Sequence, residues 1–316
     1  MTFAAVFPGQ GSQAVGMLAE LGAAETCVRE TFSEASDVMG RDLWALAQSG
    51  PEDVIKQTEI TQPLMFAAGV AVWRAWSARG GAQPELAAGH SLGEYSALVA
   101  AGVFDFASAM ALVVERGRLM STAVAPGEGG MAAILGLDDQ AVIDLCLSLT
   151  GERVVEAVNF NSPSQVVISG HVDALEKACD AAKAAGAKRA MLLPVSVPNH
   201  SSLMQGVVAP LSDAIDRASA SQPILPVLQN NEAAEPASLE ALVASLKQHV
   251  VNPVRWSETL RNIRTRGCDT VIEFGPGKVL AGLAKRTDKQ FTIVAVEDCA
   301  SLDKALEAAE QQEEVS

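Results

Sequence analysis

Apolar and polar positions along the chain form alternating blocks of two kinds. Short apolar runs bounded by glycine, proline or polar residues predict buried strands, and longer blocks with apolar residues at helical spacing predict helices. The predicted strands are 3–7, 86–88 and 270–274, and the predicted helices are 24–39, 61–76, 95–101 and 106–123. Because strands and helices follow one another in turn, we predict an α/β fold with a mainly parallel sheet.

The pattern changes after the glycine-rich segment 127–130, which we expect to be flexible. The blocks that follow predict strand, helix, strand, strand, helix and strand, with a turn between the two middle strands. These are 131–137, 139–149, 153–158, 165–169, 172–185 and 189–195, and the turn is 159–164. This order is that of a ferredoxin-like module. We therefore predict a small inserted subdomain at 127–196, a larger α/β subdomain formed by 1–126 and 197–316, and a ligand cleft between them.

The composition narrows the class of protein. A chain of 316 residues that is 49% hydrophobic can bury a sizeable core. Its apolar runs are shorter than the roughly 18 residues of a membrane helix, and its start, MTFAAVFPGQGSQ, predicts a strand and not a signal peptide. The five cysteines are widely separated, which favours reduced thiols in the cytoplasm and no metal site.

Charge is distributed unevenly along the chain. The formal net charge of −15 disfavours a nucleic-acid partner. Between Arg255 and Lys289, however, eight basic residues face four acidic ones, which is a local excess of +4. This stretch is either a basic docking surface or a set of solvated helix faces. The acidic tail 307–316 is expected to be a helix end.

The segment 89–93, GHSLG, lies between a predicted strand and a predicted helix. It matches G-x-S-x-G, in which small neighbours allow a sharp strand-to-helix turn that exposes the serine hydroxyl. The following helix N-terminus favours negative charge nearby. Ser91 is therefore a candidate nucleophile, and a serine in a purely structural turn is the alternative.

A serine nucleophile needs a base, and the chain has four histidines. His200 follows the last strand of the inserted module, at a hinge position that faces the predicted cleft. His90 adjoins Ser91 but points elsewhere in a strand-to-turn geometry, His171 opens a helix, and His249 lies in a polar helix end. His200 is the best candidate. No aspartate stands out as its partner, and a carbonyl that accepts the Nδ1–H can serve instead.

Arg116 lies on the apolar face of the predicted helix 106–123, whereas Arg118 shares a face with polar residues. An inward-pointing arginine is unfavourable unless it meets an anion. That anion is either a structural carboxylate or the carboxylate of a substrate, which a guanidinium binds through two parallel hydrogen bonds.

The glycine-rich loop 7–14, FPGQGSQA, follows the first predicted strand and fits a loose dinucleotide-binding fingerprint. The acidic residues at the spacing that this fingerprint requires, Glu30 and Glu34, fall in a helix-like block. A tight glycine turn can equally present backbone N–H groups to an oxyanion, and the loop alone does not decide between these functions.

Seven ordered segments together resemble one family. They are FPGQGSQ (7–13), GHSLGEYSAL (89–98), VERGRLM (114–120), VNFNSPSQVVISG (158–170), VSVPNH (195–200), NPVRW (252–256) and EFGPGKVLAGL (273–283). The chain resembles the malonyl-CoA:acyl carrier protein transacylases of bacterial type II fatty acid synthesis, which are related to the acyltransferase domains of polyketide synthases. The resemblance extends over nearly the whole chain.

The resemblance implies a large α/β-hydrolase-like subdomain with a parallel sheet and an inserted small ferredoxin-like subdomain. It implies that Ser91 is the nucleophile, that His200 is its base and that Arg116 binds the malonyl carboxylate. It also implies that the backbone N–H groups of Gln10 and Leu92 form the oxyanion hole, which argues against dinucleotide binding by the glycine-rich loop.

One position departs from the family pattern. Four residues before the proline of NPVRW the family typically has a glutamine, whose backbone carbonyl orients the catalytic histidine. Here that residue is His249. Because a backbone contact requires no particular side chain, we expect the carbonyl of His249 to fulfil the same role.

The activity implied by the resemblance is that of an acyltransferase in fatty acid biosynthesis. It transfers malonyl from malonyl-CoA to the phosphopantetheine thiol of acyl carrier protein, through an acyl-serine and without a metal or redox cofactor. The stretch Arg255–Lys289 is then a candidate docking surface for an acidic carrier protein. Two alternatives remain: a serine esterase or thioesterase that uses water as the acceptor, and a non-catalytic module that binds carrier protein.

Overall fold

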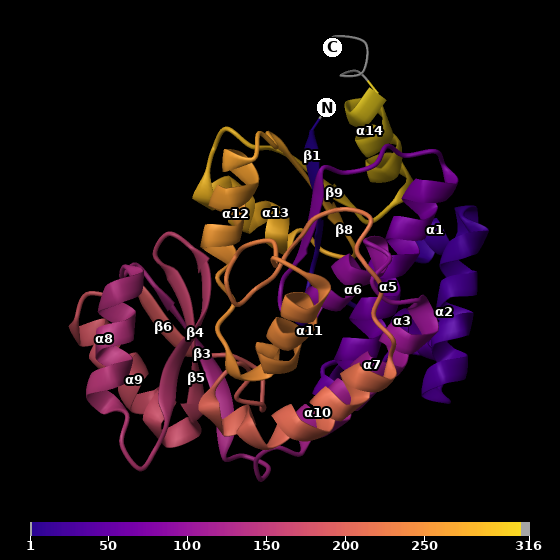
Figure 1. Ribbon diagram of the computed structural model, residues 1–316. Coiled ribbons are helices and arrows are strands. Elements are labelled where there is room, and N and C mark those ends of the chain that lie inside the picture. The colour runs from indigo at the N-terminus through magenta and orange to yellow at the C-terminus, as the bar shows by residue number, and fades with distance from the viewer. Residues whose placement is uncertain (1, 311–316) are drawn as a thin grey trace.

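Five short apolar strands form the larger of two sheets in the computed structural model, which describes residues 2–310 (Figure 1). The strands lie in the order β7-β2-β1-β8-β9, and every neighbouring pair is parallel. Their bounds are β1 (Phe3–Phe7), β2 (Leu86–Gly89), β7 (Val227–Leu228), β8 (Thr270–Phe274) and β9 (Thr292–Val296). The predicted α/β fold with a parallel sheet is therefore confirmed.

Helices cover both faces of this sheet, and further helices pack against them. They are α1 (Ala19–Ala24), α2 (Thr26–Met39), α3 (Leu43–Ser49), α4 (Glu52–Ile55), α5 (Thr58–Ala78), α6 (Gly93–Ala100), α7 (Phe106–Ser121), α10 (Gln205–Arg217), α11 (Leu239–Gln248), α12 (Trp256–Thr265), α13 (Val279–Thr287) and α14 (Cys299–Glu310), with the 3₁₀ helices η1 (Ser202–Met204) and η2 (His249–Val251). Side chains of β1 alternate between the two faces. Phe3, Ala5 and Phe7 enter the core that α5 fills, and Ala4 and Val6 enter the core under α12 and α13. Residues 311–316 of the predicted C-terminal helix end lie outside the described residues.

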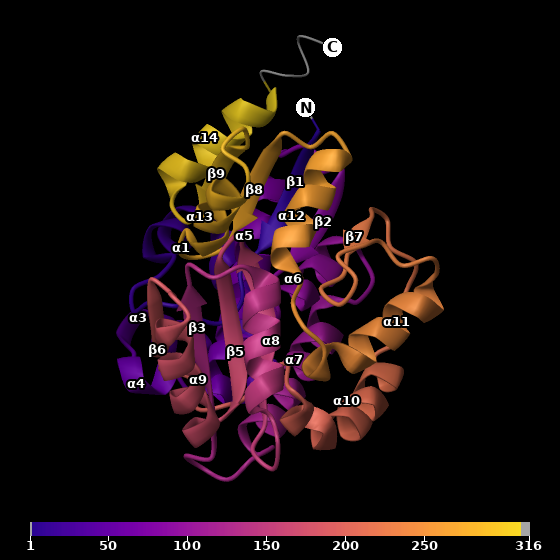
Figure 2. The same ribbon diagram turned by 90° about the vertical axis from the view of Figure 1, so that its left-hand side faces the viewer.

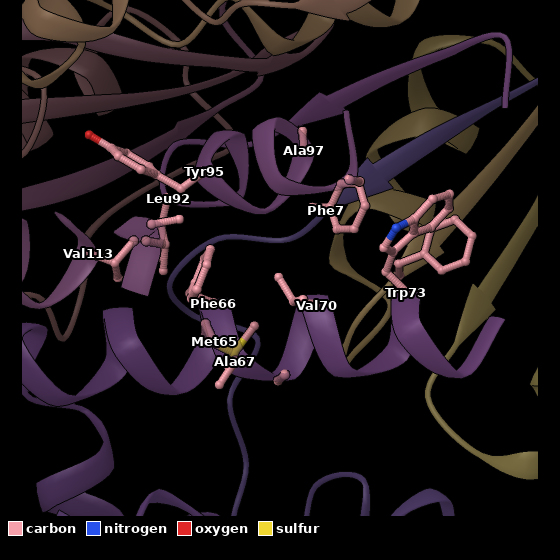
Figure 3. Close-up of a cluster of buried hydrophobic side chains, with 14 of the residues drawn as sticks. Phe7, Met65, Phe66, Ala67, Val70, Trp73, Leu92, Tyr95, Ala97 and Val113 are labelled. Atoms are coloured by element: carbon pink, nitrogen blue, oxygen red, sulfur yellow. The ribbon is translucent and has the colours of Figure 1, made fainter. Parts of the chain in front are cut away.

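Helix α5 is buried along most of its length because it lies between the sheet and other helices. The ring of Trp73 lies 6.2 Å from that of Phe7 between centroids, in an edge-on arrangement. Figure 3 shows Phe66 and Val70 on the side of α5 that faces Leu92 and Phe7. This apolar cluster supports the segment that joins β2 to α6, where Ser91 lies.

The second sheet is antiparallel and has the strand order β4-β5-β3-β6. Its strands are β3 (Gly129–Leu135), β4 (Val155–Ser162), β5 (Gln165–His171) and β6 (Arg189–Leu192), and its helices are α8 (Asp139–Leu149) and α9 (Val172–Ala184). Both helices pack on one face of the sheet through a separate apolar cluster. Figure 2 shows this unit as a distinct layer beneath β1, β8 and α12.

Two local predictions in this region were wrong. Gly129 and Gly130, which the sequence analysis placed in a flexible segment, pair with β5 as the first residues of β3. The predicted turn 159–164 is mostly strand, because β4 continues to Ser162 in a ladder with β5 that contains two irregularities. Asparagine and serine favour turns locally, but here tertiary pairing satisfies their backbone groups.

Strand β4 also joins the second sheet to the rest of the chain. Val254 N–H donates to the carbonyl of Val158 (2.8 Å), and Phe160 N–H donates to the carbonyl of Val254 (2.9 Å). The face of the second sheet opposite α8 and α9 carries Met131 and Val167, which line a cavity between the two sheets.

Candidate active site

A cavity of about 240 Å³ lies between the two sheets, where the sequence analysis placed a cleft. Ser91 and His200 line it together with Gln10 from the glycine-rich loop. Arg286 from α13 and Asn161 from β4 line it as well. The tertiary structure therefore brings together candidate residues that lie up to 190 positions apart in the chain.

Ser91 occupies a sharp turn between β2 and α6, with a φ angle of 52°. A Cβ at Gly89 would lie 1.9 Å from the carbonyl carbon of Gly93, and a Cβ at Gly93 would lie 2.0 Å from the carbonyl oxygen of Phe7. Only glycine fits at these two positions, since the backbone segments pass in direct contact. A non-glycine residue in the left-handed region between two such glycines is the geometry of a nucleophile elbow.

His200 is the base candidate that the structure places against the serine. Its Nε2 lies 2.7 Å from the Oγ of Ser91. Its Nδ1 lies 3.1 Å from the carbonyl oxygens of both His249 and Asn252. Because a carbonyl can only accept, Nδ1 carries the proton and Nε2 presents its lone pair to the serine hydroxyl. This is the tautomer that a general base requires.

Burial and, to a smaller extent, the positive charge of Arg116 lower the pKa of His200 to about 3. The side chain is only 2% exposed, so the charged imidazolium loses nearly all of its hydration. An unfolded histidine titrates near 6.5, so the unfolded chain binds this proton more tightly than the folded one. The stability of the fold therefore falls as the pH decreases from about 6.5 towards 3.

A direct titration tests this protonation state. The imidazole carbon–proton NMR signal of His200, assigned by its loss in His200→Ala, is expected to keep the shift of neutral imidazole from pH 8 to pH 5. A free histidine would change over this interval, with a midpoint near 6.5. A titration of the assigned signal between pH 6 and pH 7 would contradict the lowered pKa.

Arg116 points inward from α7 and is 1% exposed, as the helical pattern predicts, whereas Arg118 is exposed and pairs with Glu115. One terminal nitrogen of Arg116 donates to the Oε1 of Gln62. The other lies 3.5 Å from the Oγ of Ser91. Within residues 2–310, no carboxylate lies within 4.0 Å of this guanidinium, and its Nε has no hydrogen-bond partner. The charge of Arg116 is therefore not neutralised by direct contact with a carboxylate of the described residues, although Glu94 is close enough to stabilise it electrostatically.

Gln10 lines the same cavity, and Leu92 directly follows Ser91 in the elbow. Gly9 lies so close to the elbow that a Cβ there would be 2.5 Å from the carbonyl oxygen of His90. Among the described residues, neither the backbone N–H of Gln10 nor that of Leu92 has a hydrogen-bond partner. Both groups can therefore donate to a further acceptor near Ser91, which is the requirement for an oxyanion hole.

His249 lies at the end of α11, as expected, but it is fully buried in η2, so the expected polar surroundings were wrong. Its ring centroid lies 5.2 Å from that of His200, and neither ring nitrogen has a hydrogen-bond partner in the described part of the chain. Burial lowers the pKa of His249 well below its usual value. Its carbonyl accepts from His200, as the resemblance implies, and it shares this function with the carbonyl of Asn252, which the sequence analysis missed.

Further polar residues of the site were also missed. His90 bonds to the Oδ1 of Asn161 through its Nε2 (2.7 Å). Gln62 is a polar residue beside the long apolar run of α5, and this position could have indicated its buried contact with Arg116. Glu94, three residues after Ser91, is 1% exposed; burial raises its pKa to about 7, although hydrogen bonds from Asn230 and the charge of Arg116 oppose the shift.

Within 2–310, no group of three or more histidine, cysteine, aspartate or glutamate side chains could hold a metal ion. No helix in this range is long and apolar enough to span a membrane.

Residues 4–312 match the family model of the acyl transferase domain. The chain belongs to this acyl transferase family. The malonyl CoA-acyl carrier protein transacylase of Salmonella typhimurium is 49% identical over 304 residues, which are 96% of this chain and 98% of the relative. The corresponding protein of Bacillus subtilis is 37% identical, over 97% of each chain.

Two solved structures match this chain with a similar identity and over a similar length. An acyl carrier protein S-malonyltransferase from Vibrio cholerae has a TM-score of 0.93 and 49% identity, covering 96% of this chain and 99% of that one. A malonyl-transacylase in complex with a type II PKS acyl-carrier protein has a TM-score of 0.95 and 50% identity, covering 98% and 100%. The chain therefore matches these relatives along nearly its whole length.

Proposed function

We propose that the chain transfers a malonyl group from malonyl-CoA to the phosphopantetheine thiol of acyl carrier protein, as a supply step of fatty acid biosynthesis. The observation that carries the proposal is a single arrangement around the Oγ of Ser91. His200 Nε2 lies 2.7 Å from this atom, and the buried guanidinium of Arg116 lies 3.5 Å from it. A nucleophile with its base and a carboxylate-binding group so close together fits an acyl donor with a free carboxylate.

In the first half-reaction, His200 removes the hydroxyl proton as Ser91 Oγ attacks the thioester carbonyl. The tetrahedral oxyanion accepts hydrogen bonds from the N–H groups of Gln10 and Leu92, each of which typically contributes about 10²–10³ in rate. The carbon–sulfur bond then breaks, and His200 returns the proton to the departing thiolate. The products are free CoA thiol and a malonyl ester on Ser91.

In the second half-reaction, the thiol of the carrier protein gives its proton to His200 and attacks the ester. Collapse of the oxyanion breaks the ester bond, and His200 protonates the Oγ of Ser91. Arg116 holds the malonyl carboxylate throughout, so the ester stays aligned with the incoming thiol. Every bond change is completed by these groups and the two thiols, so the proposal includes no metal or redox cofactor.

Mass spectrometry after mixing the protein with malonyl-CoA tests the proposal. We expect a malonyl mass increase on the peptide that contains Ser91, and transfer of this mass to holo carrier protein when it is added. A protein that forms no adduct is a binding module and not an enzyme of this type. An adduct that releases malonate at the same rate with and without carrier protein would identify a hydrolase.

We propose that the chain consists of two subdomains. We assign 127–196 to a ferredoxin-like subdomain, supported by the strand order β4-β5-β3-β6 and the two helices on one face. We assign 1–126 and 197–316 to an α/β-hydrolase-like subdomain, supported by the parallel sheet and the serine elbow after β2.

A cytoplasmic location is supported by the five free cysteines, since disulfides are rare in that compartment.

The docking surface for the carrier protein is narrower than the basic stretch Arg255–Lys289. Half of its basic residues form ion pairs within the chain: Arg255 with Glu258, Arg264 with Asp269 and Asp288, Arg266 with Glu235, and Lys278 with Glu297. Among the described residues, Arg261, Lys285, Arg286 and Lys289 have no carboxylate within 4.0 Å. Arg286 lines the cavity, so we place the docking surface at Lys285, Arg286 and Lys289.

Charge reversal at this surface is expected to separate the two half-reactions. In Lys285→Glu/Lys289→Glu, transfer to carrier protein should slow by about 10-fold at low salt, because steering of the acidic partner is lost. Acylation of Ser91 by malonyl-CoA should change little. The matched control is Lys177→Glu/Lys183→Glu on α9, which packs on the face of the second sheet opposite the cavity. Equal losses in both variants, or losses that persist at high salt, would remove this docking surface.

A further inference from the structure

The side chain of Asn230 contacts the backbone on both sides of the nucleophile. Asn230 follows the edge strand β7, and its Oδ1 accepts a hydrogen bond from the N–H of Ser91 (2.7 Å). Its Nδ2 donates to the carbonyl of Gly89 (2.6 Å). The side chain is 1% exposed, so water does not compete for these groups. The mechanism described above makes no use of this residue.

These two hydrogen bonds extend the pairing between β7 and β2 beyond the last residue of β7. β7 pairs with β2 only at Val227 and Leu228, whereas β2 continues to Gly89 and then turns sharply. A primary amide offers one acceptor and N–H donors in a plane, as a peptide group does. The side chain of Asn230 thus takes the place of a peptide group beside the elbow. The amide has one possible orientation, because Ser91 needs an acceptor and Gly89 needs a donor.

Glu94 holds this amide in place. Its Oε2 accepts from both the backbone N–H (2.8 Å) and the Nδ2 (2.6 Å) of Asn230, and its Oε1 lies 3.3 Å from the Nε2 of Gln229. Every group that reaches this carboxylate is a donor. A buried carboxylate is unfavourable unless it is hydrogen-bonded, and these donors supply the hydrogen bonds that Glu94 needs inside α6.

We propose that Asn230, held by Glu94, is a positioning residue that fixes the backbone of Ser91 in its strained turn. The proposal rests on the assignment of Ser91 as the nucleophile. The hydrogen bond to the N–H of Ser91 holds the φ angle of 52°, at which the Oγ lies 2.7 Å from His200 Nε2. The next peptide carries the N–H of Leu92, which the proposed function uses as an oxyanion donor. Rotation of the Ser91 backbone would displace the nucleophile and this oxyanion donor together.

The isosteric variant Asn230→Asp tests the proposal, because it replaces the Nδ2 donor with an oxygen that faces the carbonyl of Gly89 and the carboxylate of Glu94. We expect the single-turnover rate of Ser91 acylation by malonyl-CoA to fall by about 10²-fold, the effect of a misplacement near 1 Å. The Kd of malonyl-CoA, measured in a Ser91→Ala background, should stay within twofold. The matched control is Asn231→Asp, one residue further on, where the Nδ2 bonds only to Ser245. Its acylation rate should stay within threefold of wild type.

Glu94→Gln provides a second route to the same result and decides the matter if Asn230→Asp does not fold. It keeps the shape of the side chain but places a donor opposite the donors of Asn230 or Gln229, so a loss of about 10-fold in acylation rate is expected. Because both residues act through one contact, the double variant should lose less than the product of the two single losses.

The outcomes separate this proposal from the proposed function. A wild-type protein that forms no Ser91 adduct would overturn both. A wild-type protein that forms the adduct, together with folded Asn230→Asp or Glu94→Gln that acylate at the wild-type rate, would overturn the positioning function alone. A loss that lies entirely in Kd, with an unchanged rate at saturation, would also overturn it, because a positioning residue acts on the rate constant.

Discussion

Replacing Ser91 with alanine is expected to slow malonyl transfer by about 10⁴–10⁶-fold, and replacing His200 with alanine by a similar factor. The double variant is expected to be no slower than the slower single variant. The reason is that every proton that His200 moves belongs to Ser91 Oγ or to a thiol that reacts at this atom, and the Oγ lies 2.7 Å from its Nε2. Once Ser91 or His200 is absent, the remaining residue cannot accelerate the reaction, so the rate losses of the two single variants do not multiply in the double variant.

The measurement is the rate of CoA release in the presence of holo carrier protein, with the mass of the Ser91 peptide followed in parallel. His249→Gln is the matched control for His200→Ala, because it changes the adjacent buried imidazole but keeps the carbonyl that accepts from His200. Its rate should stay within about 10-fold of wild type. Multiplying losses in the double variant, or an equal loss in His249→Gln, would contradict the pairing of Ser91 with His200.

Replacing Arg116 with alanine is expected to lower the preference for malonyl-CoA over acetyl-CoA by about 10²–10³-fold. The guanidinium is buried, and within residues 2–310 it pairs with no carboxylate. A malonyl carboxylate would therefore complete a buried, charge-assisted pair, and removal of one partner of such a pair typically costs about 2–5 kcal/mol. Acetyl has no carboxylate, so its own rate of Ser91 acylation should change much less.

The preference is measured as the ratio of kcat/KM for the two thioesters in the acylation step. Arg118→Ala is the matched control, since Arg118 lies on the exposed side of the same helix and pairs with Glu115. That variant should keep the wild-type ratio. If Arg116→Ala keeps the ratio as well, the specificity for a dicarboxylic acyl group must come from another residue.

Features set by neighbours in the chain could be predicted from the sequence. The elbow at Ser91 follows from an apolar strand, two glycines and a helix within about ten residues, and the steric contacts of Gly89 and Gly93 explain that pattern. The inward direction of Arg116 follows from the helical period alone. The assignment of His200 from its place after the inserted module agrees with its contact to Ser91.

Features that depend on distant partners could not be predicted in this way. The turn predicted at 159–164 is strand because β5 and Val254 satisfy its backbone, which overrides the local preference of asparagine and serine. Four of the eight basic residues in Arg255–Lys289 form ion pairs, including Arg266 with Glu235, which is 31 positions away. A count of charges along the chain cannot detect such pairs.

Local sequence patterns predict the alternation of strands and helices, the serine elbow and the buried arginine, because each depends on periodicity or on steric contacts between near neighbours. Three features became visible only in the folded chain: His249 is buried, Asn252 shares the Nδ1 proton of His200, and Asn230 hydrogen-bonds to Ser91 from 139 positions away. The physical reason is that a hydrogen bond depends on two groups meeting in space, and local patterns do not contain the position of the second group.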